Sequence, residues 1–301
     1  MHNPSGTYRI QFHKGFTFKD FTAVLPYLTQ LGVGTIYASP IFEAVSGSTH
    51  GYDTINPLQI NPEIGNIGEL KTLSAALKKL GISWIQDIVP NHMAYDGHNA
   101  WLMDIFESGP HSHHYPYFDH SLSSTYFKGP IMVPCLAHSL QESIMLGEVK
   151  LTLSSAGLAF AAGGQHWACS LNTYEPIFGK GKDQVVAEAG TTFTKEQLEA
   201  VNSQPEKLII LAEQQYFRLC NPAETDHTIN FRRFFAVNGL IGLNIGLQGV
   251  FDHFHQLIAE LIRENIFQGL RVDHIDGLTD PSAYLNRLRQ LAGGRPPRLF
   301  Q

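Results

Sequence analysis

Short runs rich in β-branched and apolar residues alternate with longer amphipathic segments along the first hundred residues. The pattern predicts strands over 8–12, 35–38 and 84–89 and helices over 18–31 and 67–80. Gly32 and Gly81 follow the two helices, at a position where glycine commonly ends a helix. This alternation is typical of βαβ units in a parallel sheet.

The regular pattern stops after Pro90 and resumes only near residue 250. Between them lie an aromatic and His-rich run at 111–118, β-like pieces near 148–153 and 158–161, and a helix near 194–202. A structureless loop of that length is rare in a compact domain. We therefore expect an inserted, irregular subdomain at residues 95–226, between a first segment at 1–94 and a continuation at 227–301.

The pattern that resumes predicts a helix over 250–264, a strand over 269–272 and a helix over 282–291. These complete four β/α units, which is half of an eight-unit α/β TIM barrel. We expect an open, four-stranded parallel sheet with helices outside, followed at most by the start of a fifth strand. The chain is expected to be a truncated part of a longer protein.

Composition narrows the class of partner. The chain has a net charge of −6 and only 16% charged residues, without a basic stretch suited to nucleic acid or an anionic membrane. Its three cysteines are widely spaced and form no CxxC pair, which disfavours both a disulfide framework and a zinc ribbon. With no signal peptide or long apolar run, we expect a cytoplasmic protein that acts on a small or neutral ligand.

Three polar clusters stand at the C-terminal ends of the predicted strands, the rim where parallel barrels build their active sites. They are 48–53 after the second strand, 87–92 around the end of the third, and 269–277 on the fourth. Each cluster has a plain structural reading on its own. Their shared position at the rim favours a functional site.

Arg271 and Asp273 are two residues apart, so their side chains lie on the same side of a strand. The guanidinium would keep the neighbouring carboxylate ionised and available as a nucleophile. A purely structural ion pair is the alternative reading. His274 and Asp276 add two further titratable groups at this strand end, and such crowding favours a ligand or a reaction.

Asp87 and His92 flank the end of the third predicted strand. The aspartate could point into the barrel and support the imidazole, which could donate to a substrate hydroxyl. The alternative is that the histidine is only a hydrogen-bonded structural group. Tyr52, beside His50 and Asp53, could offer a flat ring to the apolar face of a sugar. The alternative is that the Tyr52 ring only packs.

The motif D-x-x-x-N-H at 87–92 and the motif R-x-D at 271–273 resemble those of the α-amylase superfamily, glycoside hydrolase family 13. Five longer stretches are similar to the maltooligosyl trehalose synthase family in particular. They are TYRIQF at 7–12, GSTHGYD at 47–53, DIVPNHMA at 87–94, INFRRFF at 229–235 and GLRVDHIDGL at 269–278. The resemblance extends over nearly the whole chain.

The resemblance implies that Asp273 is the catalytic nucleophile and Arg271 its electrostatic partner. It implies that His92 and Tyr52 bind the sugar at the reacting subsite. We expect substrate contacts also from His50, His274 and Asp276, and structural support from Asp53, Asp87 and Asn91. The general-acid glutamate and the third carboxylate of the family have no counterpart in the sequence, so we expect the chain alone to be inactive. No cofactor and no metal ion is expected, and Asn91 lacks the acidic oxygen cluster that a calcium site needs.

The activity implied for the whole enzyme is an intramolecular transglucosylation that converts the reducing-end α-1,4 bond of a maltooligosaccharide to α-1,1. Two alternatives remain open at this point. One is an α-glucan hydrolase of the α-amylase type, and the other is an inactive fragment or sugar-binding remnant. The His111–His114 run is expected to be a solvated loop rather than a metal site.

Overall fold

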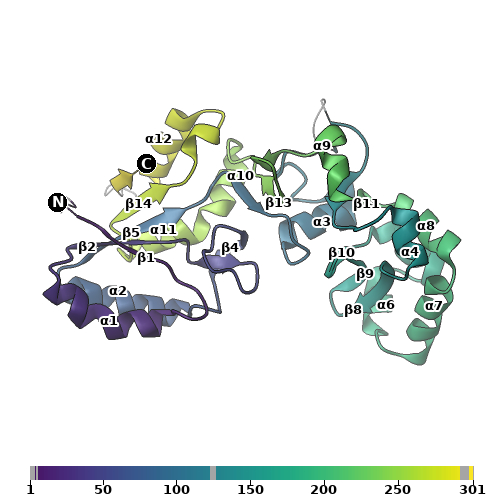
Figure 1. Ribbon diagram of the computed structural model, residues 1–301, viewed down its shortest axis with the longest axis horizontal. Helices are drawn as coiled ribbons and strands as arrows, with labels where there is room; N and C mark the ends of the chain where they lie inside the picture. Colours follow the sequence, from purple (N-terminus) through teal and green to yellow (C-terminus); the bar gives the residue numbers. More distant parts are fainter. Residues whose placement is uncertain (1–3, 5, 123–126, 292–297, 301) are drawn as a thin grey trace. The chain divides into compact units, whose positions relative to one another are not determined.

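The structure is a computed structural model that describes residues 4, 6–122, 127–291 and 298–300. Two compact units make up the chain (Figure 1). The first unit contains 1–94 and 243–301, and the second contains 95–242. The second unit therefore ends at Gly242, beyond the boundary at 226 that the sequence predicts. The difference arises because a hairpin at 233–242 has too short a pattern to be assigned from sequence.

The first unit is built on a parallel sheet of five strands, in the order β1-β2-β5-β14-β15. The strands are β1 (Tyr8–Ile10), β2 (Thr35–Ala38), β5 (Ser83–Ile88), β14 (Gly269–Val272) and β15 (Arg298–Phe300). The sequence led us to expect four strands followed at most by the start of a fifth, and the short strand β15 occupies that fifth position. The fifth strand, β15, pairs in parallel with β14 through Gly269, Leu270 and Arg271.

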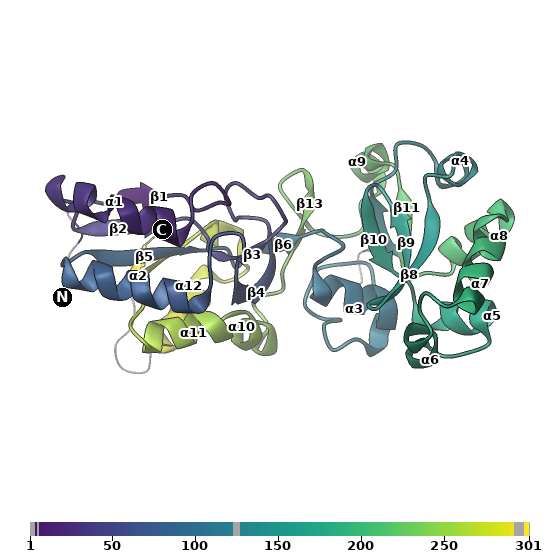
Figure 2. The same cartoon turned by 90° about the horizontal axis from the view of Figure 1, so that it is seen from below.

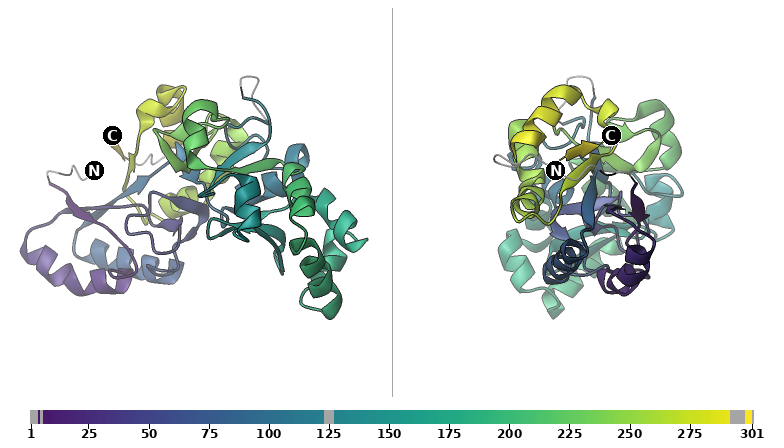
Figure 3. Two further views of the ribbon diagram at one scale, coloured as in Figure 1. Left: turned by 45° about the vertical axis from the view of Figure 1, so that its right-hand side comes forward. Right: turned by 90° about the vertical axis from the view of Figure 1, so that its left-hand side faces the viewer.

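Helices α1 (Phe18–Gln30) and α2 (Ile67–Lys79) lie side by side along the sheet (Figures 1 and 3). Both begin with a capping box, formed by Thr17 and Asp20 in α1 and by Asn66 and Glu69 in α2. Their apolar faces cover an aromatic cluster in which the Phe12 ring lies 4.9 Å from Phe18, 5.6 Å from Phe21 and 6.2 Å from Trp84. The helices thereby close one face of the sheet and leave the polar strand ends to the rim.

Two features of the first unit differ from the predicted pattern. A hairpin of β3 (Phe42–Ala44) and β4 (Thr54–Ile60) follows β2, where no strand was predicted. The helix predicted over 250–264 is divided into α10 (Gln248–Phe254) and α11 (Gln256–Arg263). His255 stands at the break, where its ring Nδ1 lies 2.7 Å from the Phe251 carbonyl oxygen. The last helix, α12 (Pro281–Gln290), and the short strand β6 (His92–Ala94) complete the unit.

The chain leaves the first unit and returns to it at neighbouring points. The backbone amide of Leu243, the first residue after the second unit, donates to the carbonyl oxygen of Asn91 at 2.9 Å. Asn91 precedes the last residue before the second unit, Ala94, by only three positions. The two crossings are therefore held together within the first unit itself.

The second unit is more regular than the predicted irregular subdomain (Figure 2). It contains an antiparallel sheet in the order β10-β9-β8, a parallel pair β11-β7 and an antiparallel hairpin β12-β13. Its strands are β7 (Ile131–Pro134), β8 (Lys150–Ser154), β9 (Gly157–Ala162), β10 (Gln165–Ala168), β11 (Phe217–Cys220), β12 (Arg233–Phe234) and β13 (Val237–Gly242). Its helices are α3 (Ala100–Ser108), α4 (Leu140–Met145), α5 (Tyr174–Phe178), α6 (Lys182–Ala187), α7 (Thr192–Asn202), α8 (Pro205–Glu213) and α9 (Thr225–Thr228). In the described part of the chain, no helix has both the length and the apolar character needed to cross a membrane.

The buried His255 should make stability depend on pH. Burial lowers its pKa from 6.5 to about 3, so the folded state favours the neutral ring, which contacts the Phe251 carbonyl and the Tyr284 hydroxyl. This contribution is complete above pH 6.5 and is lost as the pH falls from there toward 3. Between pH 7 and pH 5 the loss should be about 2 kcal/mol. We expect the difference in unfolding free energy between the native chain and His255→Gln, measured by urea denaturation, to shrink by this amount. An unchanged difference would contradict the assignment of a neutral ring.

Candidate active site

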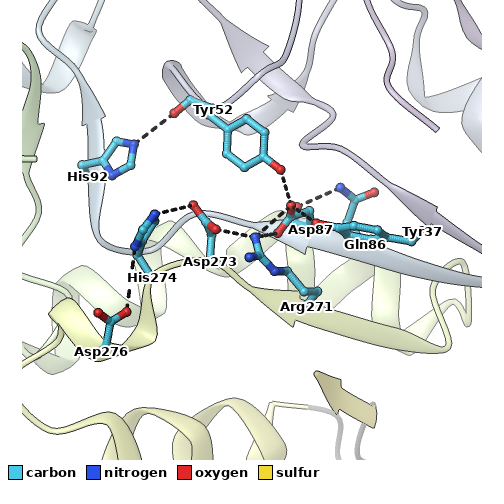
Figure 4. Close-up of polar contacts among 9 residues, drawn as sticks. All are labelled: Tyr37, Tyr52, Gln86, Asp87, His92, Arg271, Asp273, His274 and Asp276. Atoms are coloured by element: carbon cyan, nitrogen blue, oxygen red, sulfur yellow. Dashed lines mark hydrogen bonds and ion pairs between the residues drawn. The ribbon is translucent and has the colours of Figure 1, made fainter. Parts of the chain in front are cut away.

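The register of the parallel sheet places four polar side chains on one face. Arg9 on β1 pairs with Tyr37 on β2, and Arg271 on β14 pairs with Asp87 on β5. Tyr37 is also opposite Ile85, two positions before Asp87, so it lies on the same face as the Asp87 carboxylate. Side chains from four neighbouring strands therefore share this face of the sheet. Figure 4 shows three of them, Tyr37, Asp87 and Arg271.

Asp87 is the centre of this group and has no exposed surface. Its Oδ2 accepts hydrogen bonds from the hydroxyls of Tyr37 and Tyr52, both at 2.6 Å. Burial raises the pKa of both phenols, and the bond to Asp87 raises it further, so both stay protonated and can donate. Burial also raises the pKa of Asp87, while the two tyrosines and Arg271 oppose that shift.

Arg271 joins Asp87 to Asp273 through a single nitrogen. Its Nη1 lies 3.1 Å and 3.2 Å from the two carboxylate oxygens of Asp87 and also donates to Oδ1 of Asp273. Although burial lowers it, the charges of the two carboxylates raise the pKa of Arg271 above its ordinary value. The guanidinium is therefore a permanent positive charge between two acids.

Asp273 directly follows β14 and remains attached to the sheet. Its backbone amide donates to the Ile88 carbonyl oxygen at 3.0 Å, which continues the pairing of β14 with β5 by one residue. The side chain points to the same side as Arg271 and Tyr52 (Figure 4). A carboxylate fixed in this way at a strand end, with a cation on one oxygen, can act as a nucleophile or bind a ligand cation.

The backbone turns sharply after Asp273. His274 has a φ of 46°, in the left-handed region, which few residues other than glycine adopt. Its ring lies between two acids, with Nε2 3.9 Å from Asp273 and Nδ1 3.9 Å from Asp276. The Asp276 side chain is 87% exposed, so of the two acids only Asp273 belongs to the enclosed group.

Tyr52 belongs to the loop between β3 and β4, and short polar contacts hold this loop. Ser48 Oγ donates to Asp53 at 2.5 Å and accepts from the Gly51 amide at 3.1 Å. His50 Nδ1 accepts from the Tyr52 amide at 3.1 Å and lies 3.7 Å from Asp53. His50 and Asp53 thus shape the loop that presents Tyr52, because both make these contacts within the loop itself.

Two contacts from outside the loop hold its base. Both carboxylate oxygens of Glu63 accept from the Gly47 amide at 3.0 Å, and Glu63 also accepts from the Ser46 hydroxyl at 2.9 Å. On the other side, the Gln11 amide donates to the Thr49 carbonyl at 2.8 Å. Neither Glu63 nor Gln11 was predicted as a site residue, because neither lies in a recognisable strand-end cluster.

His92 and Asn91 lie at the end of the same segment as Asp87. The buried His92 ring has its Nε2 3.2 Å from the Tyr52 carbonyl oxygen, so it contacts the backbone of the loop. Asn91 is buried against Gly277, where a Cβ would come within 2.5 Å of the Asn91 amide nitrogen. Asn91 therefore has a packing role in this structure.

The described residues contain no group of three or more His, Cys, Asp or Glu side chains arranged to hold a metal ion. In the His111–His114 run, His114 lies 2.7 Å from Asp104 and stacks on Trp101. This histidine therefore has partners in its own unit.

The structure brings together most of the predicted site residues. Asp87, Tyr52, Arg271 and Asp273 are linked directly, and His92 and His274 lie next to members of this group. Two residues that were not predicted join them. Tyr37 donates to Asp87, and Arg9 lies 5.9 Å from the Tyr37 ring, with its pKa raised by Tyr52. Arg9 lies in the stretch 7–12 that resembles the synthase family, whereas Tyr37 lies in none of the resembling stretches.

Comparison with known proteins gives consistent results. Residues 17–132 match the family model of the α-amylase catalytic domain. A protein of Mycobacterium tuberculosis (strain ATCC 25618 / H37Rv) that carries the name of a maltooligosyl trehalose synthase is 33% identical over 95% of this chain, and the match covers 33% of that protein.

Solved structures show the same relationship. The maltooligosyltrehalose synthase from Arthrobacter ramosus is similar with a TM-score of 0.78 and 31% identity, over 99% of this chain and 34% of that one. A DSM5389 glycosyltrehalose synthase is similar with a TM-score of 0.80 and 35% identity, over 98% of this chain and 36% of that one. The fold is therefore TIM-barrel-like, and the chain spans about a third of the length of the relatives that it matches.

The loop that carries Tyr52 should depend on Gly51. Gly51 has a φ of 78°, and a Cβ there would come within 2.5 Å of the Pro40 carbonyl oxygen. Gly32 has a nearly equal φ of 75° but has open space around it, so Gly32→Ala is a matched control for the backbone strain alone. We expect Gly32→Ala to cost about 1 kcal/mol of stability and Gly51→Ala about 1–3 kcal/mol more. Urea denaturation measures both, and equal losses would show that the Pro40 contact does not constrain the loop.

Proposed function

We propose that the chain forms part of an enzyme that rearranges the reducing end of maltooligosaccharides. The proposal rests on its similarity to the α-amylase catalytic domain and to maltooligosyl trehalose synthases. The product would carry an α-1,1 bond in place of the terminal α-1,4 bond. One observation carries the proposal. Asp273 stands at the end of β14 with Arg271 on one oxygen, on the side of the sheet where Tyr52 lies.

The reaction begins with Asp273. A carboxylate oxygen attacks the anomeric carbon of the penultimate glucose, a covalent bond to that carbon forms, and its bond to the leaving oxygen breaks. The leaving glucose takes a proton from a general acid. It then turns and returns its own anomeric hydroxyl, which gives up a proton to the same acid and displaces Asp273. One glycosidic bond is lost and one is gained, so no water is consumed.

The neighbouring groups have distinct roles in this proposal. Arg271 orients the nucleophile, because its charge lies between Asp273 and Asp87. Tyr52 presents its ring to the sugar while its hydroxyl remains on Asp87. His92 lies against the Tyr52 backbone and donates to a sugar hydroxyl, and His274 and His50 contact the sugar farther from the reacting carbon.

A second carboxyl group is required about 5 Å from the nucleophile to protonate the leaving oxygen. Asp87 does not suit this role because two phenols and a guanidinium occupy its oxygens. Asp276 is 87% exposed and pairs with the far side of His274. We propose that the acid belongs to a part of the enzyme that these 301 residues do not include, in line with the third of each relative that they match.

A hydrolase of the α-amylase type is the second candidate. The α-amylase catalytic-domain match at 17–132 favours it, because that region contains Tyr52, Asp87 and His92. The two candidates share the nucleophile and differ in the acceptor. Non-reducing products from maltopentaose identify the synthase, whereas new reducing ends identify the hydrolase.

The chain alone should be inactive on maltopentaose, because general acid catalysis contributes about 10² to 10⁴-fold and the proposed acid is missing. A fusion of residues 1–301 to the remaining two thirds of the Arthrobacter ramosus enzyme should restore activity. Chromatography of the products measures both, and the unaltered Arthrobacter enzyme is the positive control. Non-reducing product from the chain alone would contradict the proposed division of the active site.

In that fusion, Asp273→Asn should reduce turnover by at least about 10⁴-fold, since the amide cannot form the covalent intermediate. The matched control is Asp252→Asn, a substitution on α10 of an acid that is not among the proposed site residues, and it should retain full activity. Circular dichroism confirms that both variants fold. An active Asp273→Asn enzyme would rule out this residue as the nucleophile.

A further inference from the structure

Tyr37 is a polar residue in the middle of the sheet for which the proposed reaction has no use. It lies one position before the end of β2, half-buried, and the register of β1 with β2 places Arg9 opposite it. Its hydroxyl donates to the Asp87 carboxylate at 2.6 Å (Figure 4). Its function must therefore be exerted through Asp87.

The donors around Asp87 are divided unequally between its two oxygens. Oδ2 receives two phenol hydrogen bonds at 2.6 Å, from Tyr37 and Tyr52, which is short for an O–H···O bond. Arg271 Nη1 contacts both oxygens at 3.1 Å and 3.2 Å, near the long end for an N–H···O bond. The Gln86 amide donates to the Asp87 backbone carbonyl and not to the carboxylate. The two phenols thus stabilise much of the negative charge on Asp87, which Arg271 would otherwise have to stabilise alone.

Among the residues that the structure describes, Arg271 is the only lysine or arginine within ion-pair distance of Asp87 or Asp273. The His274 ring also lies beside Asp273. The same nitrogen serves both carboxylates. If the Asp87 carboxylate attracts Arg271 more strongly, the ion pair between Arg271 and Asp273 must therefore weaken. Asp87 and Asp273 thus compete for one guanidinium. The tyrosine hydroxyls stabilise the charge on Asp87 and so weaken its attraction for Arg271.

We propose that Tyr37 is a positioning residue for the nucleophile: by donating to Asp87 Oδ2 together with Tyr52, it leaves Arg271 available to Asp273. This inference rests on the proposed role of Asp273 in glycosyl transfer. Removing the Tyr37 hydroxyl leaves one oxygen of a buried carboxylate with a single phenol donor. Arg271 then moves toward Asp87, and Asp273 loses its orientation.

The test uses the fusion enzyme with α-maltosyl fluoride as the donor. Asp273 attacks the anomeric carbon, the carbon–fluorine bond breaks and fluoride leaves, so this step needs no protonated leaving oxygen. Glucose, added in excess, then displaces Asp273 through its anomeric hydroxyl, which restores the free carboxylate for the next turnover. Tyr37→Phe should lower kcat for fluoride release about tenfold and leave KM within about twofold, since Tyr37 does not contact the sugar. Tyr27→Phe, a substitution in α1 of a tyrosine that is 58% exposed, should change neither constant.

A double-variant cycle separates positioning from packing. In an Asp87→Asn background there is no second carboxylate to compete for Arg271, so adding Tyr37→Phe should change kcat less than about twofold. A role in packing alone would give the same tenfold loss in both backgrounds and would overturn the proposal. Tyr52→Phe removes the other phenol from the same oxygen and should show the same dependence on Asp87 in kcat, which provides a test if Tyr37→Phe does not fold.

A crystal structure of the Tyr37→Phe chain gives a readout that does not depend on activity. Arg271 Nη1 should lie closer to Asp87 and farther from Asp273 than in the native chain. An unmoved guanidinium, or an unchanged kcat, would overturn the proposal. Failure of the proposed function itself has a different signature, because fluoride release would then persist in Asp273→Asn.

Discussion

The burial of one negative charge, on Asp87, determines the arrangement of the rim of the sheet. A carboxylate without solvent is costly unless it is paired and hydrogen-bonded. Tyr37, Tyr52 and Arg271 supply the donors, and each comes from a different segment of the first unit. The loop between β3 and β4, strand β2 and strand β14 are consequently tied to one point on β5. Asp273 is held in place because it shares Arg271 with that point.

The sequence was sufficient to predict the parts of this arrangement that depend on local periodicity. The strands around Ile36, Ile85 and Leu270 and the helices α1 and α2 follow from apolar spacing, and the common side of Arg271 and Asp273 follows from their separation of two residues. Tyr37 and Arg9 could not be assigned in this way. Their significance depends on the register between neighbouring strands, which is set by tertiary pairing and leaves no mark in a single strand.

The incorrect predictions have physical causes as well. The helix predicted over 250–264 has an uninterrupted apolar stripe, but the His255 ring approaches the Phe251 carbonyl and Tyr284, and the helix breaks there. The β3-β4 hairpin was not predicted because its first strand has only three residues and its register shifts twice. The second unit seemed irregular because its strands and most of its helices are too short to show a period.

The hydrogen bond between the Leu243 amide and the Asn91 carbonyl has a consequence for the modularity of the chain. Because the two crossings are already joined within the first unit, the whole segment 95–242 is topologically an excursion from a single point on the rim. Closing such a gap with a few residues would cost little chain entropy, since the ends do not have to be brought together. A variant in which a short linker replaces the inserted unit would therefore keep the strand pairing of the first unit unchanged.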